Sequence, residues 1–543
     1  MFDYIIIGAG SAGCVVANRL SANPKNTVLL IEAGNKDKKL EIHVPAAYSK
    51  LNYSNVDWGY YTEPQPHVNN RKMYQPRGKT LGGSSSTNAM AYIRGHKLDY
   101  DRWETMGATG WNYAACLPYF KKSEHNEQLH DDFHGTTGEL NVTFAQQHKT
   151  PLADAFIDAC VENKIPRIID VNGAEQHGAA LFQYTIKNGE RHSAAKAFLK
   201  PIQDRKNLTV KTNAHVQRIL IENDTAVGVE IVVNEKLEQI KARKEIILCA
   251  GAFGSPQILM LSGIGDGAEL SEMGIEVKKE LPGVGKNLHD HLFYGISALS
   301  KWKGTLNNVN LPFNQFRHTL AWLFQRKGPL TTSPLEAVAF FKTANNLPQP
   351  DLQLHFVPAH IGNDTHLAAG ADFYNPKTYP KTDGFTILPS LIQPKSRGYV
   401  ALRSKNPNDA PIIQPNYLTH PDDLQTLIKG YYKVKAIIES EAFKPFTAGV
   451  SFPEKIDSEA EIISHIQKTL ESIYHPVGTC KMGQDAMSVV DPELRVYGVK
   501  NLRVADASVM PQVISGNTNA PTIMIAERAA EFLAFSNELI TKI

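Results

Sequence analysis

Cysteine is scarce in this chain, and the few that occur show no recognisable spacing. The 543 residues include five cysteines, at Cys14, Cys116, Cys160, Cys249 and Cys480, and no two of them form a C-x-x-C pair. An odd and scattered set of thiols argues against a disulfide framework and against a structural zinc site, so we expect no metal. Reduced thiols in the cytoplasm are the simplest interpretation.

An excess of charge of either sign is also missing. The chain has 57 Lys and Arg against 55 Asp and Glu, which gives a formal net charge of +2. Such a balance provides no overall field that would attract nucleic acid, so no nucleic-acid partner is expected, although local basic patches remain open. With 42% hydrophobic and 21% charged residues, the composition excludes wholesale disorder.

Long apolar runs are absent too. No stretch of 18 apolar residues occurs, so no transmembrane segment is expected. The opening MFDYIIIGAG places Asp3 before its apolar run and has no Lys or Arg there, so we expect no secretory signal. Peripheral contact with a membrane stays open.

The opening residues carry the first informative pattern, which is typical of a strand, a turn, a helix and a second strand. Tyr4–Ile7 and Val28–Ile31 are short apolar runs of the kind found in buried parallel strands, and residues 11–20 suit a helix. Between them lies Gly-Ala-Gly-Ser-Ala-Gly at residues 8–13, with Glu32 directly after the second strand. This combination predicts a dinucleotide-binding turn.

Each glycine in that turn has a physical role. Gly8 permits the tight turn, Gly10 lets the backbone approach a pyrophosphate, and Gly13 allows the helix to pack closely on the strand. The carboxylate of Glu32 can accept hydrogen bonds from ribose hydroxyls, and it argues against a 2′-phosphate. We therefore expect a dinucleotide other than NADP.

Two more glycine-rich segments follow, at residues 77–88 (RGKTLGGSSSTN) and 251–265 (GAFGSPQILMLSGIG). The first contains Gly-Lys-Thr but is not a phosphate-binding P-loop, because Met73 stands where that motif needs its first glycine. Further along, residues 208–221 and 227–249 are typical of strands with hairpin connections, and Leu352–Val357 and Phe385–Leu391 are short strand candidates.

These segments, together with YHPVGTCKMG at residues 474–483, LRVADAS at 502–508 and SGNTNAPT at 515–522, resemble the glucose–methanol–choline (GMC) flavoprotein oxidoreductases. Within that family the chain looks most similar to bacterial FAD-dependent alcohol and choline dehydrogenases. The resemblance implies an α/β fold with a Rossmann-type FAD-binding domain and an inserted substrate domain, built on an antiparallel sheet covered by helices. The expected segments are 1–155, 200–295 and 470–543 for the FAD-binding domain, and 156–199 and 296–469 for the substrate domain.

The resemblance also implies which residues bind FAD. They are Gly8, Gly10, Ser11, Gly13, Glu32, Ala33, Gly82, Gly83, Ser84, Asn88, Val216, Asp506 and Thr518. Some family members attach FAD covalently through a histidine, but Thr87 occupies the matching position here and cannot form an imidazole link. We therefore expect FAD to be bound non-covalently.

Oxidation of an alcohol by a flavin removes a proton from the hydroxyl and a hydride from the adjacent carbon. A histidine, with an ordinary pKa of about 6.5, suits the proton transfer. The sequence has 19 histidines, and spacing alone does not choose among them. The resemblance singles out His475 as the base, with Asn517 positioning the hydroxyl while hydride passes to flavin N5; an amide cannot itself take the proton.

Two further positions are ambiguous. His289-Asp290-His291 looks like a metal pair, but the family places Asp-His there without metal, and His289 is assigned no role. Glu336 either lines the substrate pocket or is a solvated loop carboxylate. A carboxylate in that pocket would suit the quaternary cation choline.

The expected function is therefore oxidation of a primary alcohol to the aldehyde. Choline oxidation and, less favoured, a non-redox hydroxynitrile lyase that keeps its FAD are the alternatives, followed by a nucleotide-binding module without turnover. An NAD enzyme is least favoured because it would leave the later glycine-rich segments without purpose. The electron acceptor, whether quinone, protein carrier or oxygen, stays open.

Overall fold

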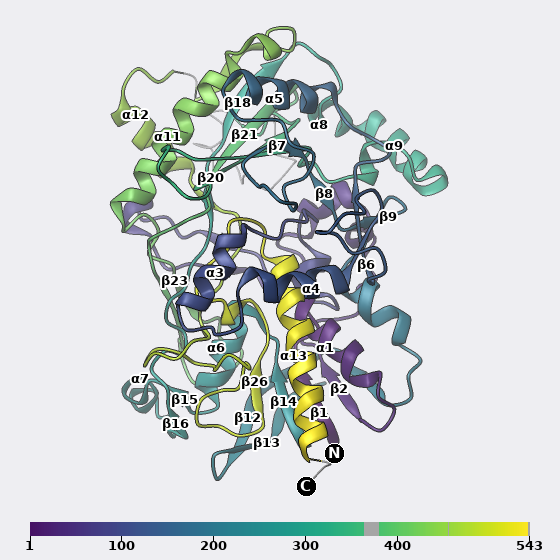
Figure 1. Cartoon of the computed structure of the whole chain (residues 1–543), viewed down its shortest axis with the longest axis vertical. Helices are drawn as coiled ribbons and strands as arrows, with labels where there is room; N and C mark the ends of the chain where they lie inside the picture. The colour runs from purple at the N-terminus through teal and green to yellow at the C-terminus, as the bar shows by residue number, and fades with distance from the viewer. Residues whose placement is uncertain (363–379, 454, 541–543) are drawn as a thin grey trace.

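Two β-sheets, one toward each end of the long axis, organise the chain (Figure 1). The structure is a computed structural model that describes residues 1–362, 380–453 and 455–540, with no side chains described for residues 535–540. Within these residues, no helix combines the length and the apolar character that crossing a bilayer requires.

The first sheet contains the predicted dinucleotide-binding turn. Its strands run in the spatial order β11 (Leu208–Lys211), β2 (Val28–Ile31), β1 (Phe2–Ile7), β14 (Lys236–Leu248), β13 (Thr225–Val233) and β12 (Ala214–Glu222), with β26 (Leu502–Val504) beside β14. β1, β2, β11, β14 and β26 pair in parallel, whereas β12, β13 and β14 are joined as antiparallel hairpins. The short runs of β1 and β2 are buried, as parallel strands covered on both faces should be.

Helices α1 (Ser11–Ser21) and α13 (Asn519–Ile540) pack together against this sheet, and Figure 1 shows α13 beside β1 and β14. An ion pair fixes them, because Arg19 of α1 donates from Nε to Glu527 of α13 over 2.9 Å. The first and last parts of the chain thereby form one layer. Helix α13 begins at Asn519, two residues after Asn517.

The second sheet is antiparallel, as predicted. Its strands run β24 (Thr447–Phe452), β18 (Ile296–Ser300), β21 (Gly384–Leu391), β20 (Leu352–Val357), β19 (Ala337–Phe341) and β7 (Gly178–Leu181), with β17 (Leu292–Phe293) between β21 and β25 (Glu471–Ser472). Helices α5 (Pro151–Glu162), α11 (Pro421–Ile438) and α12 (Glu459–Thr469) cover one face.

Alternation along a strand gives this sheet two different faces. In β20, Leu354 and Phe356 point into the core beneath the helices, whereas His355 and Val357 point to the other side, into a cavity. The Rossmann-type domain and helix-covered antiparallel sheet are thus confirmed, while the boundaries of the five predicted segments stay a prediction.

The remaining elements are short and connect or flank the two sheets. They are α2 (Leu40–His43), α3 (Lys97–Thr105), α4 (Tyr113–Ser123), α6 (Gly251–Leu261), α7 (Gly267–Glu272), α8 (Leu306–Val309), α9 (Pro312–Gln325), β3 (Tyr60–Tyr61), β4 (Tyr74–Gln75), β5 (Glu124–Asn126), β6 (Leu140–Phe144), β8 (Gln183–Tyr184), β9 (Ile186–Lys187), β10 (Glu190–Arg191), β15 (Ile264–Gly265), β16 (Lys279–Glu280), β22 (Tyr399–Ala401) and β23 (Ile412–Gln414). Short 3-10 and π turns are the other helical elements of the described residues.

Candidate active site

A cavity of about 560 Å³ lies between the two sheets. The end of β1 and the turn after it line one part, and the outward side chains of β20 and β21 line another. Loops that carry His475 and Asn517 complete the wall. Residues from most of the chain's length therefore meet around a single space.

Where the cavity meets the first sheet, the glycine-rich segments contribute backbone without side chains to its wall. Gly82 donates its N–H to the carbonyl of Ala9 over 2.7 Å, which joins the second glycine-rich segment to the first. A Cβ on Gly83 would lie 2.7 Å from the Cα of Gly10, too close for any side chain. On Gly10 itself, a Cβ would meet nothing nearer than 4.0 Å. The two glycines thus bring the segments into contact and leave open room for a phosphate group beside α1.

Gly13 and Gly82 are predicted cofactor residues that do not line the cavity. A Cβ on Gly13 would lie 1.9 Å from the carbonyl oxygen of Gly8, so this glycine serves the packing of α1 on the turn. Gly82 has a φ of +87°, which suits glycine at a bend. The other predicted cofactor residues all line the cavity: Gly8, Gly10, Ser11, Glu32, Ala33, Gly83, Ser84, Asn88, Val216, Asp506 and Thr518.

Two buried carboxylates face this part of the cavity. Glu32 accepts from the backbone N–H of Ala9 over 3.0 Å and from that of Gly34 over 2.8 Å. Burial raises the pKa of Glu32 to about 7 despite these bonds. Each of its oxygens retains a lone pair for a further donor such as a ribose hydroxyl. Asp506 accepts from the N–H of Gly251 over 2.8 Å and holds the start of α6.

The predicted catalytic pair is brought together at the same cavity. Asn517 Nδ2 lies 3.2 Å from Nε2 of His475, and both residues line the wall. On its other side, His475 Nδ1 lies 3.0 Å from Nδ1 of His291. Since the amide nitrogen can only donate, the network assigns the lone pair of His475 to Nε2 and its proton to Nδ1. The lone pair therefore points toward the cavity.

The residues that fix His475 lie in the tract His289-Asp290-His291, where the sequence pointed only to an improbable metal pair. Asp290 accepts from the backbone N–H of His475 over 2.8 Å and from the hydroxyl of Tyr417 over 2.7 Å. His291 provides the ring contact described above, whereas His289 turns away to Asn287, with 2.8 Å between Nε2 and Oδ1. Among the described residues, no three His, Cys, Asp or Glu side chains group as a metal site.

Electrostatics keep the imidazole uncharged. Burial lowers the pKa of His475 well below its ordinary value, and the guanidinium of Arg77, together with any charge on the neighbouring rings of His291 and His355, lowers it further. Burial also lowers the pKa of His291 to about 3. A neutral His475 can accept a proton at any pH near neutrality.

The part of the cavity formed by the second sheet is mostly apolar. Its wall includes Phe293, Val357 and Leu388 from the sheet and Trp322 from α9. Between residues 293 and 388, the described lining residues include no Asp or Glu. This half therefore offers an apolar surface and no counter-ion.

Both interpretations of Glu336 are wrong. The residue is 5% exposed, so it is not a solvated loop carboxylate, and it is not among the described residues that line the cavity. Instead it accepts from the hydroxyl of Thr150 over 2.5 Å and from its N–H over 3.2 Å, beside the start of α5. Burial raises the pKa of Glu336 to about 7, and its role is to anchor that helix.

One part of the cavity has a nucleotide-binding turn, and another has a neutral, hydrogen-bonded histidine. Together these features are typical of a dinucleotide-dependent oxidoreductase. Comparison with known proteins agrees. The chain belongs to the GMC oxidoreductase family, which it matches over residues 2–293 and 394–526.

Relatives match over nearly the whole chain. An alcohol dehydrogenase [acceptor] of Pseudomonas putida is 44% identical and an oxygen-dependent choline dehydrogenase of Sinorhizobium fredii is 42% identical, with coverage of 98% of this chain and 96% and 95% of theirs. A crystal structure of pyridoxine 4-oxidase from Mesorbium loti is 30% identical with a TM-score of 0.87, covering 98% of this chain and 99% of that one.

FAD is the cofactor that the family and these neighbours support, and the residues present fit it. The contact of Gly10 with Gly83 leaves side-chain-free space beside α1, and buried Glu32 keeps acceptor capacity there. Asn517 Oδ1 is buried without a hydrogen-bond partner among the described residues. A buried polar atom without a hydrogen-bond partner is expected where a bound molecule supplies that partner, and Asn517 lies at the part of the cavity away from the glycine-rich turn.

Proposed function

We propose that this chain oxidises a neutral primary alcohol with an apolar substituent to the aldehyde. The observation that carries the proposal is the pairing of neutral His475 with Asn517 on the wall of a cavity whose other half is apolar. The likeness to the alcohol dehydrogenase [acceptor] of Pseudomonas putida supports the same reaction class.

His475 is the base in this mechanism. Its Nε2 carries the lone pair, and a substrate hydroxyl that replaces the Asn517 contact would place its proton on that atom. The Nδ1–H stays with His291, which holds the ring and its tautomer. Asn517 donates from Nδ2 to the developing alkoxide oxygen and cannot take the proton itself.

FAD, when bound, supplies the hydride acceptor. The turn at Gly8–Gly10, the backbone at Gly83 and the carboxylate of Glu32 would hold it. Binding is non-covalent in our proposal because Thr87, on the cavity wall, has no imidazole to form a link. FAD modification is described for the 28% identical formate oxidase of Aspergillus oryzae, so this point needs its own test.

Choline is the second candidate, because several relatives are choline dehydrogenases. A quaternary ammonium ion favours aromatic faces and a nearby carboxylate. The described lining between residues 293 and 388 offers no carboxylate, which favours an uncharged substrate. We further propose a quinone or carrier as the electron acceptor rather than oxygen, on the likeness to the alcohol dehydrogenase [acceptor] of Pseudomonas putida. We also propose a cytoplasmic location, which is consistent with the five free and buried cysteines.

An anaerobic alcohol screen tests the proposal. The holoenzyme is mixed with butanol, benzyl alcohol or choline, and loss of the oxidised flavin absorbance is recorded. We expect the neutral alcohols to reduce the flavin rapidly and choline to do so poorly. Reduction by choline alone would favour the second candidate, and no reduction by any alcohol would favour a lyase or a binding module. Reoxidation with oxygen or a quinone analogue then identifies the acceptor.

A further inference from the structure

Helix α9 exposes apolar side chains on the face that an ordinary surface helix fills with polar residues. Gln315, Thr319 and Trp322, spaced to share one face, line the cavity. The other face points to solvent and exposes Phe313 (77%), Phe316 (64%), Leu320 (39%), Leu323 (44%) and Phe324 (80%). A surface helix normally buries its apolar stripe, so this outer stripe indicates a covering partner.

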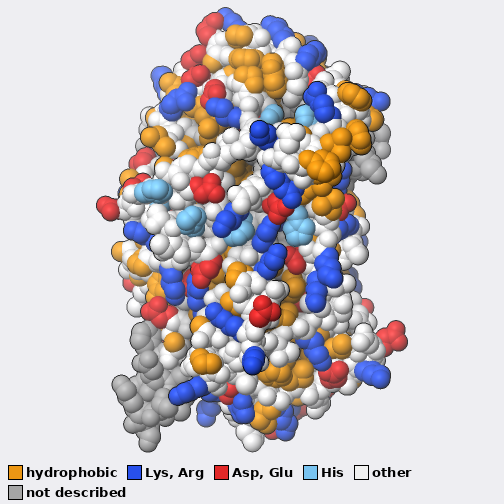
Figure 2. Space-filling view, turned by 90° about the vertical axis from the view of Figure 1, so that its right-hand side faces the viewer, with side chains coloured by type: hydrophobic (Ala, Val, Ile, Leu, Met, Phe, Trp, Pro, Cys, Tyr) orange, Lys and Arg blue, Asp and Glu red, His pale blue; other side chains and the backbone are white. Residues whose placement is uncertain are grey.

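The chain around α9 is cationic. Residues 301–335 contain no Asp or Glu but have Lys301, Lys303, Arg317, Arg326 and Lys327, in a protein whose total is only +2. Arg326 pairs with Glu190 over 2.6 Å, whereas Arg317 and Lys327 form no ion pair within the described chain. Figure 2, turned toward the side on which Figure 1 shows α9, presents hydrophobic side chains gathered in its upper part with Lys and Arg beside them.

We propose that the outer face of α9 docks this protein onto the surface of an anionic lipid bilayer. The three phenylalanines and two leucines would enter the boundary between headgroups and acyl chains, as in an amphipathic helix that lies in the interface. Arg317, four residues after Phe313, and Lys327 would meet lipid phosphates.

The charge pattern distinguishes a bilayer from a second copy of the chain. A two-fold symmetric dimer through this face would place the same patch on both partners, so that Arg317 and Lys327 would approach their own counterparts. Residues 301–335 contain no Asp or Glu that could neutralise these two positive charges. A uniformly anionic surface, by contrast, complements both cations at once.

Docking would also orient the cavity. Because the inner face of α9 forms part of the cavity wall, the docked helix would place that wall next to the bilayer. An apolar alcohol dissolved in the membrane would then reach the site by a short path. This consequence rests on the proposed function, whereas the docking itself does not.

Vesicle flotation of the holoenzyme tests the docking. The vesicles contain either phosphatidylcholine alone or equal parts of phosphatidylcholine and phosphatidylglycerol. The variant Phe316→Glu/Phe324→Glu should bind the anionic vesicles at least roughly tenfold more weakly than wild type, because it loses apolar insertion and gains repulsion. The matched control is Ile169→Glu/Leu237→Glu, which changes apolar residues that are 78% and 61% exposed elsewhere. The control should float like wild type.

A second variant, Arg317→Gln/Lys327→Gln, should weaken binding to anionic vesicles but not to phosphatidylcholine vesicles. Butanol should reduce the flavin of every variant at the wild-type rate without vesicles, which shows that the fold and chemistry are intact. Three results would each overturn the proposal. In the first, the wild type fails to float with anionic vesicles at low salt, and in the second, an α9 variant floats like the wild type. In the third, the wild type does not float but forms a dimer that the α9 variant abolishes. Flotation without flavin reduction by any alcohol would keep the docking and refute the proposed function.

Discussion

At the scale of the residue, one buried imidazole carries the proposed chemistry. Replacing His475 with Ala should leave FAD bound, because the substitution keeps the backbone N–H of this residue and its hydrogen bond to Asp290, which holds the loop in place. The turnover number should fall by about 10²–10⁴, the range for loss of a general base. Asn517→Ala should lose less, since it removes a donor but not the proton acceptor. Single-turnover flavin reduction by butanol measures both, and equal, negligible losses would place the chemistry elsewhere.

The lowered pKa of His475 leads to a prediction about how activity depends on pH. A base is active when unprotonated, so kcat/KM rises with pH through the pKa of the free enzyme. An ordinary histidine would place that rise near 6.5, but burial lowers the pKa of His475 well below this value. The kcat/KM for butanol should therefore be constant from pH 7 to 9 and fall only on the acid side of about 6.5. A rise centred above pH 7 would contradict an uncharged base in the resting enzyme.

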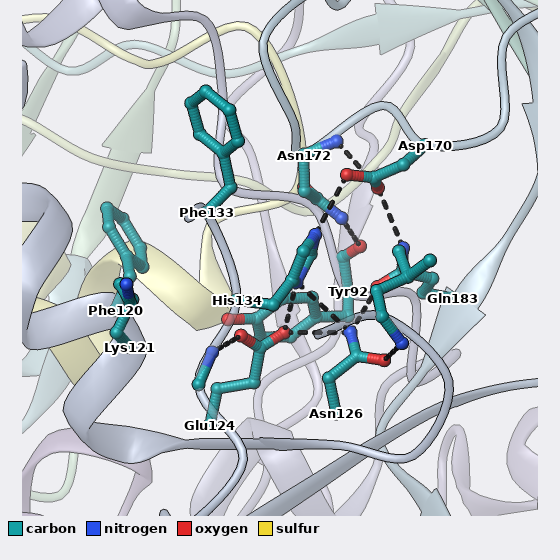
Figure 3. A network of polar contacts seen from close by, with 12 residues as sticks. Tyr92, Phe120, Lys121, Glu124, Asn126, Phe133, His134, Asp170, Asn172 and Gln183 are labelled. Carbon is teal, nitrogen blue, oxygen red and sulfur yellow. Dashed lines mark hydrogen bonds and ion pairs between the residues drawn. The ribbon is translucent and has the colours of Figure 1, made fainter. Parts of the chain in front are cut away.

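A second buried histidine, remote from the proposed chemistry, has the opposite charge state. His134 lies between two carboxylates, with Nε2 2.9 Å from Asp170 and Nδ1 3.1 Å from Glu124 (Figure 3). Arg94 also donates to Glu124 over 2.5 Å. Burial alone would lower the pKa of His134, but the hydrogen bonds to Asp170 and Glu124 outweigh it and raise the pKa to about 9.

The sign of the resulting pH effect follows from linkage. A pKa of about 9 in the folded state and about 6.5 in the unfolded state means that the His134 contribution to stability is complete below pH 6.5 and is lost as pH rises through 9. The free energy of unfolding of wild type should therefore exceed that of His134→Gln by an amount that shrinks between pH 6.5 and 10. Urea unfolding at several pH values measures it, and the exposed His67→Gln provides the control. A gap that widens with pH would exclude a protonated His134.

At the scale of the element, the contact between the two glycine-rich segments is the feature most sensitive to a single methyl group. Gly83→Ala should lose most of its FAD, because the new Cβ would lie 2.7 Å from Gly10 Cα and φ is +51°. Gly274→Ala is the matched control, with a φ of +69° and nothing within 4 Å of the added atom. The ratio of flavin to protein absorbance after purification compares them. Equal flavin content in the two variants would mean that the close contact of Gly83 with Gly10 does not control FAD binding.

Elements with a local pattern could be predicted, and contacts between distant segments could not. The sequence predicts Val28–Ile31 and Leu352–Val357 with the bounds that the structure has, since the first is an unbroken apolar run between polar residues and the second alternates apolar and polar residues. The contact of His291 with His475 joins residues 184 positions apart, and no spacing rule reaches that far. Burial of Glu336 escaped prediction for the same reason, because its partner Thr150 lies 186 residues earlier. The outer apolar face of α9 breaks the rule by which such faces are expected to be buried.

At the scale of the whole molecule, the cavity wall is discontinuous in sequence. Its members range from Ile7 to Thr522 and come from both sheets. A molecule of FAD held there would contact segments that only the fold brings together, so it binds the native state and not the unfolded chain. Each tenfold increase in free FAD above the dissociation constant should then add about 1.4 kcal/mol to the free energy of unfolding.

This dependence separates non-covalent from covalent FAD. If Thr87 leaves the cofactor unlinked, the thermal midpoint of the apoprotein should rise continuously as FAD is added, and acid precipitation of the holoenzyme should leave all the flavin in the supernatant. A covalent link would fix the cofactor at one per chain, so the midpoint would not respond to added FAD and colour would remain with the precipitate. Thr87→Ala is a discriminating variant, because it removes the hydroxyl at the matching position. It should release flavin on precipitation as completely as wild type, since on the non-covalent proposal no bond to that side chain exists to be lost.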